Sequence, residues 1–230
     1  MSELLENSVY FGVFISLAAY GAGVLMKRKW KLAVFNPLLV SIVLTIIVLL
    51  VFRVDYETYN QGGKYLSYLL TPATVCLAIP LYEQLETLKH HWKAVLAGIL
   101  SGVLSSLGSV FAMAVCFGLS HREYVTLLPK SITTAIGMGV AEELGGYVPI
   151  AVAVIVLTGI LGNVLAENIC RVFRITEPVA KGVAIGTASH AMGTARALEM
   201  GKVEGAMSSL SIVVSGLITV VGASIFANFL

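Results

Sequence analysis

The apolar residues of this chain gather in long stretches that are separated by short polar segments. A transmembrane helix needs about 20 mostly apolar residues. The stretches that meet or approach this length, and that we expect to be full spans, are residues 9–26, 32–52, 94–119, 144–166 and 205–230. The pattern therefore predicts an all-α polytopic membrane protein.

Three further apolar stretches are interrupted: residues 65–82, 124–143 and 178–199. The first contains two prolines, the second a proline, a lysine and several hydroxyl groups, and the third many glycines and a histidine. Non-helical backbone survives at membrane depth only inside protein or beside a water-filled cavity. We therefore expect these segments to be discontinuous helices that line a cavity.

Lysine and arginine residues in short loops predict which side of the membrane each loop faces. The basic clusters at residues 27–31 and 171–181 are expected on the cytoplasmic side. Residues 124–143 then start and end outside, and residues 178–199 can start and end inside, so each would form a re-entrant hairpin followed by a span. This arrangement predicts an inverted-topology repeat, which many secondary transporters contain. Eight plain crossings remain open as an alternative.

The composition supports a membrane protein. Of the 230 residues, 57% are hydrophobic and 12% are charged, whereas soluble domains carry about 25% charged residues. The mean hydropathy is +0.90, and the net charge of +2 gives no indication of nucleic-acid binding. The sequence has no nucleotide-binding or zinc-ligand motif, so we expect no enzyme, cofactor or metal. We expect one membrane domain, with residues 1–60 as scaffold or dimer-forming helices and residues 61–230 as a transport core.

Thr71, Pro72 and Thr74 lie in the first interrupted stretch. Proline lacks a backbone donor and so leaves an upstream carbonyl free. We expect this carbonyl and the two threonine hydroxyls to offer oxygen ligands. The alternative is a simple helix kink, in which the threonine side chains satisfy the freed backbone carbonyl.

Lys130 lies in the second interrupted stretch and is followed by Ser131, Thr133 and Thr134. The preceding residue, Pro129, suits the first turn of a helix, whose free amide groups would face an anion. Together, the helix amides, the lysine and the three hydroxyls would form half of an anion-binding site. Alternatively, Lys130 extends to the outer lipid headgroups.

His190 lies in the third interrupted stretch, between Ser189 and Thr194. An ionisable residue at membrane depth is by default a functional candidate. His190 could bind a substrate or take up a proton near neutral pH. The alternative is a neutral histidine that is hydrogen-bonded inside the helix bundle.

Three further residues are candidates for supporting or coupling roles. Asn163 lies well inside a span and should reach another helix or the cavity, because an unsatisfied amide in lipid is costly. Glu142 ends the second interrupted stretch and could be a solvated end instead of a site residue. Arg196 could pair with Glu199 at the inner surface.

At these interrupted stretches the sequence resembles the LrgB/CidB family, also called YohK-type proteins. The matching segments are residues 68–82, 128–134 and 186–195, and the resemblance covers essentially the whole chain. It implies a multi-pass protein of the bacterial inner membrane. Bacterial members are described as holin-like or antiholin-like modulators of murein hydrolase activity and autolysis that act with a small LrgA/CidA-type membrane partner.

The resemblance also implies a second kind of function. Related proteins are associated with transport of small monocarboxylates such as pyruvate, and the plastid glycolate/glycerate translocator carries a similar domain fused to an LrgA-like one. Interrupted helices with a lysine and a histidine favour such a carrier, secondary or facilitative. H⁺ and Na⁺ are the candidate coupling ions, and a homodimer is the expected assembly. The antiholin-like modulator is the alternative, and an accessory subunit of the LrgA-type partner is a third.

Overall fold

The computed structural model describes residues 10–30, 35–76 and 78–230. Every regular element within those ranges is helical, which confirms the all-α prediction. The chain divides into two compact units, Met1–Cys76 and Leu77–Leu230. Helices that are long and apolar enough to cross a membrane are α2 (Phe11–Trp30), α7 (Leu85–Phe117), α10 (Val148–Val172) and α12 (Lys202–Phe226), the last extended by a short 3-10 turn.

The first unit contains α2, α3 (Pro37–Val51), α4 (Tyr56–Ser67) and α5 (Leu70–Cys76), and α2 packs against both α3 and α4. Helix α3 has 15 residues, or about 22 Å, less than the hydrocarbon thickness of about 30 Å. Helix α3 is therefore shorter than the full span predicted for residues 32–52. Residues 32–34 of that stretch lie outside the described part of the chain. The cause is local: Asn36 caps the helix by accepting from the amide of Leu38, and Pro37 follows it directly.

The first interrupted stretch is broken, as predicted, by a turn at Tyr68 and Leu69 between α4 and α5. Helix α6 (Ala78–Glu83) follows further along the chain. Pro72 lies in the first turn of α5 and is exposed. A first-turn proline removes no hydrogen bond from the helix, so this proline begins a helix instead of kinking one. The side chains of Thr71 and Thr74, like residue 77, lie outside the described residues.

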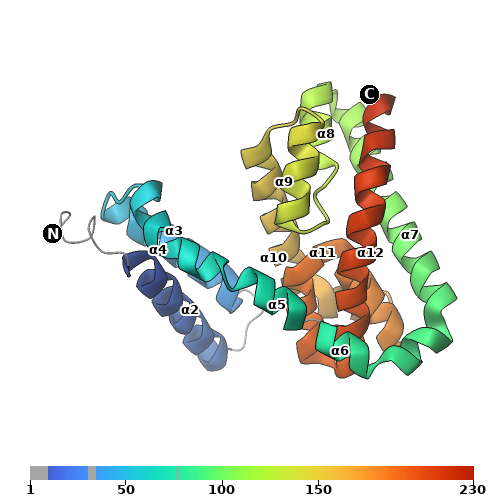
Figure 1. The fold of residues 1–230 in the computed structure, drawn as a ribbon, viewed down its shortest axis with the longest axis horizontal. Helices are drawn as coiled ribbons and strands as arrows, with labels where there is room; N and C mark the ends of the chain where they lie inside the picture. Colours follow the sequence, from blue (N-terminus) through green and yellow to red (C-terminus); the bar gives the residue numbers. More distant parts are fainter. Residues whose placement is uncertain (1–9, 31–34, 77) are drawn as a thin grey trace. The chain divides into compact units, whose positions relative to one another are not determined.

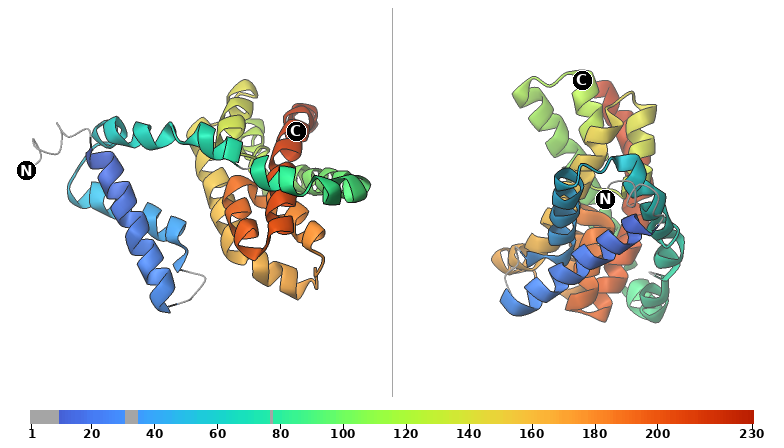
Figure 2. Two further views of the ribbon diagram at one scale, coloured as in Figure 1. Left: turned by 60° about the horizontal axis from the view of Figure 1, so that its bottom comes forward. Right: turned by 90° about the vertical axis from the view of Figure 1, so that its left-hand side faces the viewer.

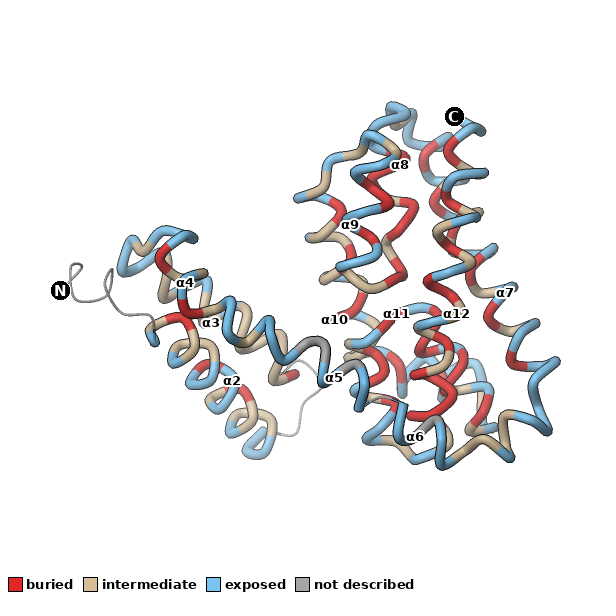
Figure 3. The backbone as a smooth tube through the Cα atoms, viewed as in Figure 1, coloured by how far each residue is buried: buried red, intermediate tan, exposed pale blue. Residues whose placement is uncertain are grey.

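The second unit contains α6, α7, α8 (His121–Leu127), α9 (Thr134–Glu143), α10, α11 (Pro178–Met200) and α12. Its core fills the space between α7, α8 and α12, with Ile99, Leu107, Tyr124 and Met207 fully buried. Figure 3 shows buried positions along α8, α11 and α12 and on one face of α7. The outer faces of the long helices carry exposed leucine, valine and isoleucine, as expected of surfaces that meet lipid.

Helices α8 and α9 form a hairpin that turns back inside the bundle. The amide of Tyr147, just after the hairpin, donates to Thr126 Oγ1 at 2.8 Å, so the hairpin begins and ends at the same level. Near its entrance, Tyr124 Oη donates to the carbonyl of Phe226 at 2.9 Å. The hairpin therefore enters beside the C-terminal end of α12 (Figure 1). This fold is compatible with the re-entrant path predicted for residues 124–143, which stays a prediction.

Helix α11 is two half-helices joined by a sharp turn. Its backbone leaves helical geometry at Ser189 (φ −137°, ψ 19°) and His190 (φ 43°, ψ −142°). Before the break, Gly186 lies against Ser208 of α12; after the break, Thr194 bonds to the same serine and Leu198 lies against Gly205. The second half therefore runs back along α12. The discontinuous helix predicted for residues 178–199 is present, while its re-entrant path in the membrane stays a prediction.

The two hairpins enter from opposite ends of α12. The open end of the α8–α9 hairpin lies at Phe226, and the open end of α11 lies at Glu204, against Gly182. Figure 2 shows the yellow α8–α9 hairpin and the orange α11 hairpin at the two ends of this helix. This geometry fits opposed re-entrant segments, while the full inverted-topology repeat stays a prediction.

Candidate functional site

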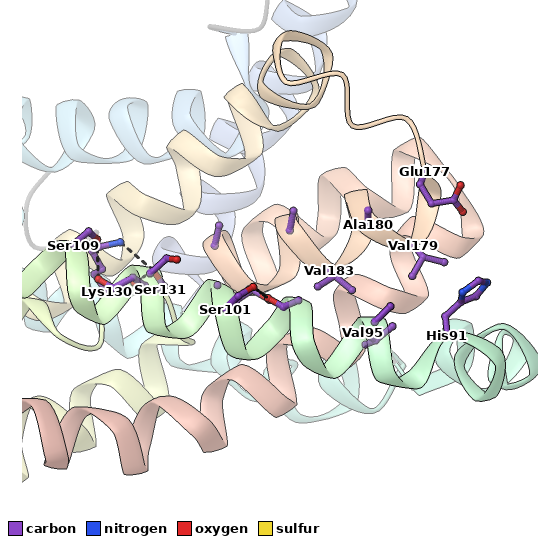
Figure 4. Close-up of a pocket in the computed structure, with 18 residues that line it drawn as sticks. His91, Val95, Ser101, Ser109, Lys130, Ser131, Glu177, Val179, Ala180 and Val183 are labelled. Carbon is purple, nitrogen blue, oxygen red and sulfur yellow. Dashed lines mark hydrogen bonds between the residues drawn. The ribbon is translucent and has the colours of Figure 1, made fainter.

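A cavity of about 690 Å³ lies between α7, the turn that joins α8 to α9, and the first half of α11. Lys130 and Ser131 line one end of it, and His91 and Glu177 line the other (Figure 4). The cavity therefore runs along α7 from the tip of one hairpin toward the open end of the other. Its walls carry both hydroxyl groups and small apolar side chains.

The Lys130 end of the cavity is positively charged. Lys130 Nζ donates to Ser131 Oγ at 3.2 Å, and Ser131 Oγ lies 3.0 Å from Ser106 Oγ of α7. Ser131 is buried and Lys130 half-buried. Lys130 has no acidic partner in the described ranges. A partly desolvated ammonium group without a counter-ion, next to hydroxyl donors, can hold a carboxylate.

The turn that presents Lys130 differs in one respect from the sequence prediction. The amide of Lys130 bonds to the carbonyl of Leu127 at 3.2 Å, and the amide of Ile132 bonds to that of Pro129 at 3.3 Å. Pro129 is therefore part of the turn, and helix α9 begins later, at Thr134. The prediction that Pro129 starts a helix was wrong. The tight turns bond two of the amides that the first turn of a helix would have left free to face an anion.

Thr133 precedes α9 as its N-cap and Thr134 is its first residue, and both lie outside the cavity wall. Thr133 has the extended backbone of a helix cap, but its side chain makes no capping hydrogen bond. Both residues are half-buried. Of the residues predicted in this stretch, the structure thus brings Lys130 and Ser131 to the cavity and leaves the two threonines beside it.

The polar residues at the α11 turn bond to α10, to α12 and to α11 itself. His190 Nε2 lies 3.1 Å from the carbonyl of Ile155 on α10. Ser189 Oγ donates to the carbonyl of Ile185 at 2.7 Å, and Thr194 Oγ1 lies 2.7 Å from Ser208 Oγ on α12. All three residues are buried and lie outside the cavity wall. This placement matches a histidine that is hydrogen-bonded inside the bundle, and its role in binding or proton uptake stays a prediction.

The backbone at His190 is strained. A positive φ is uncommon for any residue with a side chain, and holding one typically costs about 1–3 kcal/mol. Two glycines of α10 make room for the turn. A Cβ at Gly159 would lie 2.6 Å from His190 Cε1, and one at Gly162 would collide with Ser189. The glycines of α10 thus permit the close approach of the strained turn.

The residues predicted for supporting roles lie apart from the cavity. Asn163 Nδ2 donates to the carbonyl of Met192 at 2.6 Å, so it reaches another helix. Arg196 pairs with Glu199 at 2.5 Å and also with Glu167 of α10. Glu142 is exposed at the end of α9. Their coupling roles stay predictions.

A second cavity, of about 710 Å³, lies at the open end of α11. Its wall contains Arg196 and its partner Glu167, together with the basic residues Arg171, Arg174 and Lys181. These basic residues form the cluster that the sequence places on the cytoplasmic side. The hairpin formed by α11 therefore opens at the predicted cytoplasmic end of the bundle.

Sequence reasoning did not select the hydroxyl groups that α7 and α11 contribute to the first cavity: Ser101, Ser105, Ser106, Ser109 and Thr187. A signal was present, because three of these serines recur every four residues within an apolar span and so share one face. Serine in a transmembrane helix is ambiguous, however, since its hydroxyl often bonds its own helix backbone. Ser101 and Ser109 do so, to the carbonyls of Gly98 and Ser106.

Long apolar helices around two opposed helical hairpins, one of them broken at Ser189 and His190, define a polytopic all-α membrane protein with a discontinuous helix. The model of the LrgB-like family matches residues 16–229, and the chain belongs to this family. "Antiholin-like protein LrgB" of Bacillus cereus (strain B4264) is 40% identical over 222 residues, covering 96% of each chain. The protein of the same name from Bacillus anthracis (strain A0248) matches equally. No solved structure matches the chain.

Proposed function

We propose that this chain is an antiholin-like protein of the bacterial inner membrane that acts with a small LrgA-type partner to modulate murein hydrolase activity and autolysis. The observation that carries this proposal is the shared family and the 40% identity, over nearly the whole chain, to proteins named antiholin-like. The four long apolar helices found among the described residues support the membrane location.

The test of this role is an autolysis assay in a bacterial strain that lacks its own relatives of this chain and of the partner. Expression of the chain together with the partner is expected to slow detergent-induced lysis and to reduce murein hydrolase activity in the culture. Expression of either protein alone serves as the control. An unchanged lysis rate with both proteins in the membrane would contradict the proposal.

A second candidate function is a secondary or facilitative carrier of small monocarboxylates such as pyruvate, glycolate or glycerate. One observation favours it: the cavity that ends at Lys130 and lies between opposed hairpins. A protein that acts only through lateral association of apolar helices needs neither a lysine at membrane depth nor a broken helix. Both are costly to bury unless they bind something. The two functions are compatible, because control of autolysis is an effect on the cell and monocarboxylate transport is an activity of the molecule.

The carrier is tested with the purified chain in proteoliposomes, with and without the partner. Uptake of radiolabelled pyruvate or glycolate should saturate with concentration, while a co-trapped fluorescent dye stays inside. Unsaturable flux together with dye release would mean a lesion and contradict a carrier. Uptake driven by a pH gradient or by a sodium gradient would identify the coupling ion, and cross-linking in the same vesicles would test the expected homodimer.

A further inference from the structure

The wall of the second cavity, at the open end of α11, is rich in basic side chains. Its volume is about 710 Å³, within the range of about 300–1,000 Å³ that is usual for small-ligand sites. The basic residues come from the end of α10, from the loop that follows and from both halves of α11: Arg171, Arg174, Lys181 and Arg196. The acidic residues of the same wall are Glu167, Glu199 and Glu204. An anionic ligand can bind only to those positive charges that the wall does not already neutralise.

Two of the acidic side chains are occupied by arginine. Arg196 pairs with Glu199 at 2.5 Å and also with Glu167. Arg171 lies 3.8 Å from the same Glu167, so this carboxylate is shared between two guanidinium groups. The charge of Arg196 is therefore neutralised, and that of Arg171 only in part.

The third acidic side chain, that of Glu204, is held at the N-terminal end of α12. Glu204 is 9% exposed and lies in the first turn of this helix. A Cβ added at Gly201, the residue that precedes α12, would collide with Glu204 Oε2, so the carboxylate folds back toward the start of the helix. A negative charge is favourable there because of the helix dipole. Glu204 therefore needs no basic partner from the cavity wall.

Arg174 and Lys181 are the basic residues of the wall that make no ion pair with any described residue. Lys181 is half-buried, and Arg174 is exposed. Hydrogen bonds between ionised partners are about twice as strong as neutral ones, so an anion gains most from these two side chains. One lies in the loop after α10 and the other in the first half of α11, and an anion held by both would join these two segments.

We propose that this cavity binds a phosphate monoester, held between Arg174 and Lys181 with Arg171 beside it. A phosphate monoester carries about 1.5–2 negative charges near pH 7 and offers three acceptor oxygens. Two basic groups without partners, and a third that is neutralised only in part, match that charge, whereas a carboxylate brings a single charge. Arginine also suits phosphate in geometry, because its planar fork donates two parallel hydrogen bonds.

Two sources of phosphate reach this end of the protein, which the sequence places at the cytoplasmic face. One is the headgroup of a lipid with a terminal phosphate, since basic pockets between transmembrane helices on this side bind anionic headgroups. The other is a small phosphate ester in solution. The site does not depend on the carrier function proposed above, because its wall shares no residue with the cavity along α7.

The backbone of Arg174 supplies a variant that separates binding from stability. Arg174 follows the last turn of α10 with φ 54°, a left-handed conformation that glycine adopts more easily. Arg53 has φ 52° in the same position after α3, and each arginine follows a phenylalanine that ends its helix. Glycine should therefore fit both positions without loss of stability, and of the two arginines only Arg174 lies in the cavity wall.

The experiment measures binding to the purified full chain in two arms. In the first, native mass spectrometry counts the lipids retained from mixed micelles of phosphatidylcholine, phosphatidylglycerol and phosphatidic acid. In the second, calorimetry in phosphatidylcholine nanodiscs measures the binding of glycerol phosphate. Phosphatidic acid retained above phosphatidylglycerol, whose phosphate diester has a single charge, would identify a headgroup site, and binding of glycerol phosphate would identify a soluble ligand. If the native chain shows neither, the proposal is overturned.

Arg174→Gly and Lys181→Gln should each weaken the binding seen with the native chain by at least about ten-fold, as the loss of a hydrogen bond to a charged group gives. Arg53→Gly is the matched control: it removes the same charge from the same backbone conformation and should bind as the native chain does. Both glycine variants should keep or raise the thermal midpoint. Native-like binding by Arg174→Gly would overturn the site. An equal loss of binding in both glycine variants would also overturn it, because the attraction would then depend on net charge alone.

Discussion

The side-chain amide of Asn163 donates a 2.6 Å hydrogen bond to the backbone carbonyl of Met192, two residues after the break in α11. This contact holds the second half of α11 against the middle of α10. Hydrogen bonds between helices in membranes contribute about 0.6 kcal/mol on average and up to about 1.7. We therefore expect Asn163→Leu to lower the free energy of unfolding by about 1 kcal/mol.

The measurement for Asn163→Leu is unfolding in mixed detergent micelles, followed by circular dichroism. Leu161→Ala, on the exposed side of the same helix, is the control and should unfold close to the native midpoint. If the two variants lose the same stability, the bond between α10 and α11 contributes nothing that can be measured.

Gly162 is expected to tolerate no side chain. An added Cβ there would collide with Ser189 at the α11 turn, whereas a Cβ at Gly108 of α7 would meet nothing within 4 Å. Alanine is favoured over glycine in a helix by up to about 1 kcal/mol, so Gly108→Ala should be neutral or stabilising. Gly162→Ala should destabilise by about 1–3 kcal/mol, the usual cost of overpacking. Thermal unfolding of the two variants tests this prediction. Equal midpoints would mean that the α11 turn lies farther from α10 than the structure places it.

The breaks in the second and third interrupted stretches could be predicted from sequence because they depend on local chemistry. A proline or a run of glycines weakens a helix locally, and a transmembrane helix tolerates it only where neighbouring groups satisfy the backbone. The re-entrant paths were predicted from the positions of lysine and arginine, which report on the membrane side of each loop, and they stay predictions. The family resemblance rested on the same segments and was confirmed by the family match.

The residues of the cavity wall could be predicted only in part. Lys130 and Ser131 were found because charge and hydroxyls stand out in an apolar stretch. Thr187 and Ser106 were missed because the direction of a hydroxyl depends on which helix lies opposite. Periodicity helps little here, since a helix that is apolar on all sides shows no preferred face. For the same reason, the sequence did not show that His190 turns toward α10 and away from the cavity.

His190 has a positive φ of 43°, a conformation that glycine adopts far more easily. His190→Gly and His190→Ala both lose the contact with the carbonyl of Ile155, so their difference reports on the backbone. Relief of strain of about 1–3 kcal/mol, reduced by the extra entropy of glycine in the unfolded chain of about 0.4–1 kcal/mol, should leave the glycine variant more stable by about 1–2 kcal/mol. Thermal unfolding of the two variants measures this difference, and an alanine variant of equal stability would show an unstrained turn.

The pairing of α2 with α3 in the first unit gives a test that is independent of the cavity. Gly23 lies against the backbone of Pro37, where an added Cβ would be 2.8 Å from the carbonyl oxygen, while a Cβ at Gly21 of the same helix would meet nothing within 4 Å. Backbone cannot move aside as a flexible side chain can, so Gly23→Ala should force the two helices apart. We expect a loss of about 1–3 kcal/mol for Gly23→Ala and no loss for Gly21→Ala. Protease sensitivity of the segment between α2 and α3, measured in detergent, should rise in the first variant alone; if it rises in both, the cause is a general loss of helix packing and the close contact at Pro37 is refuted.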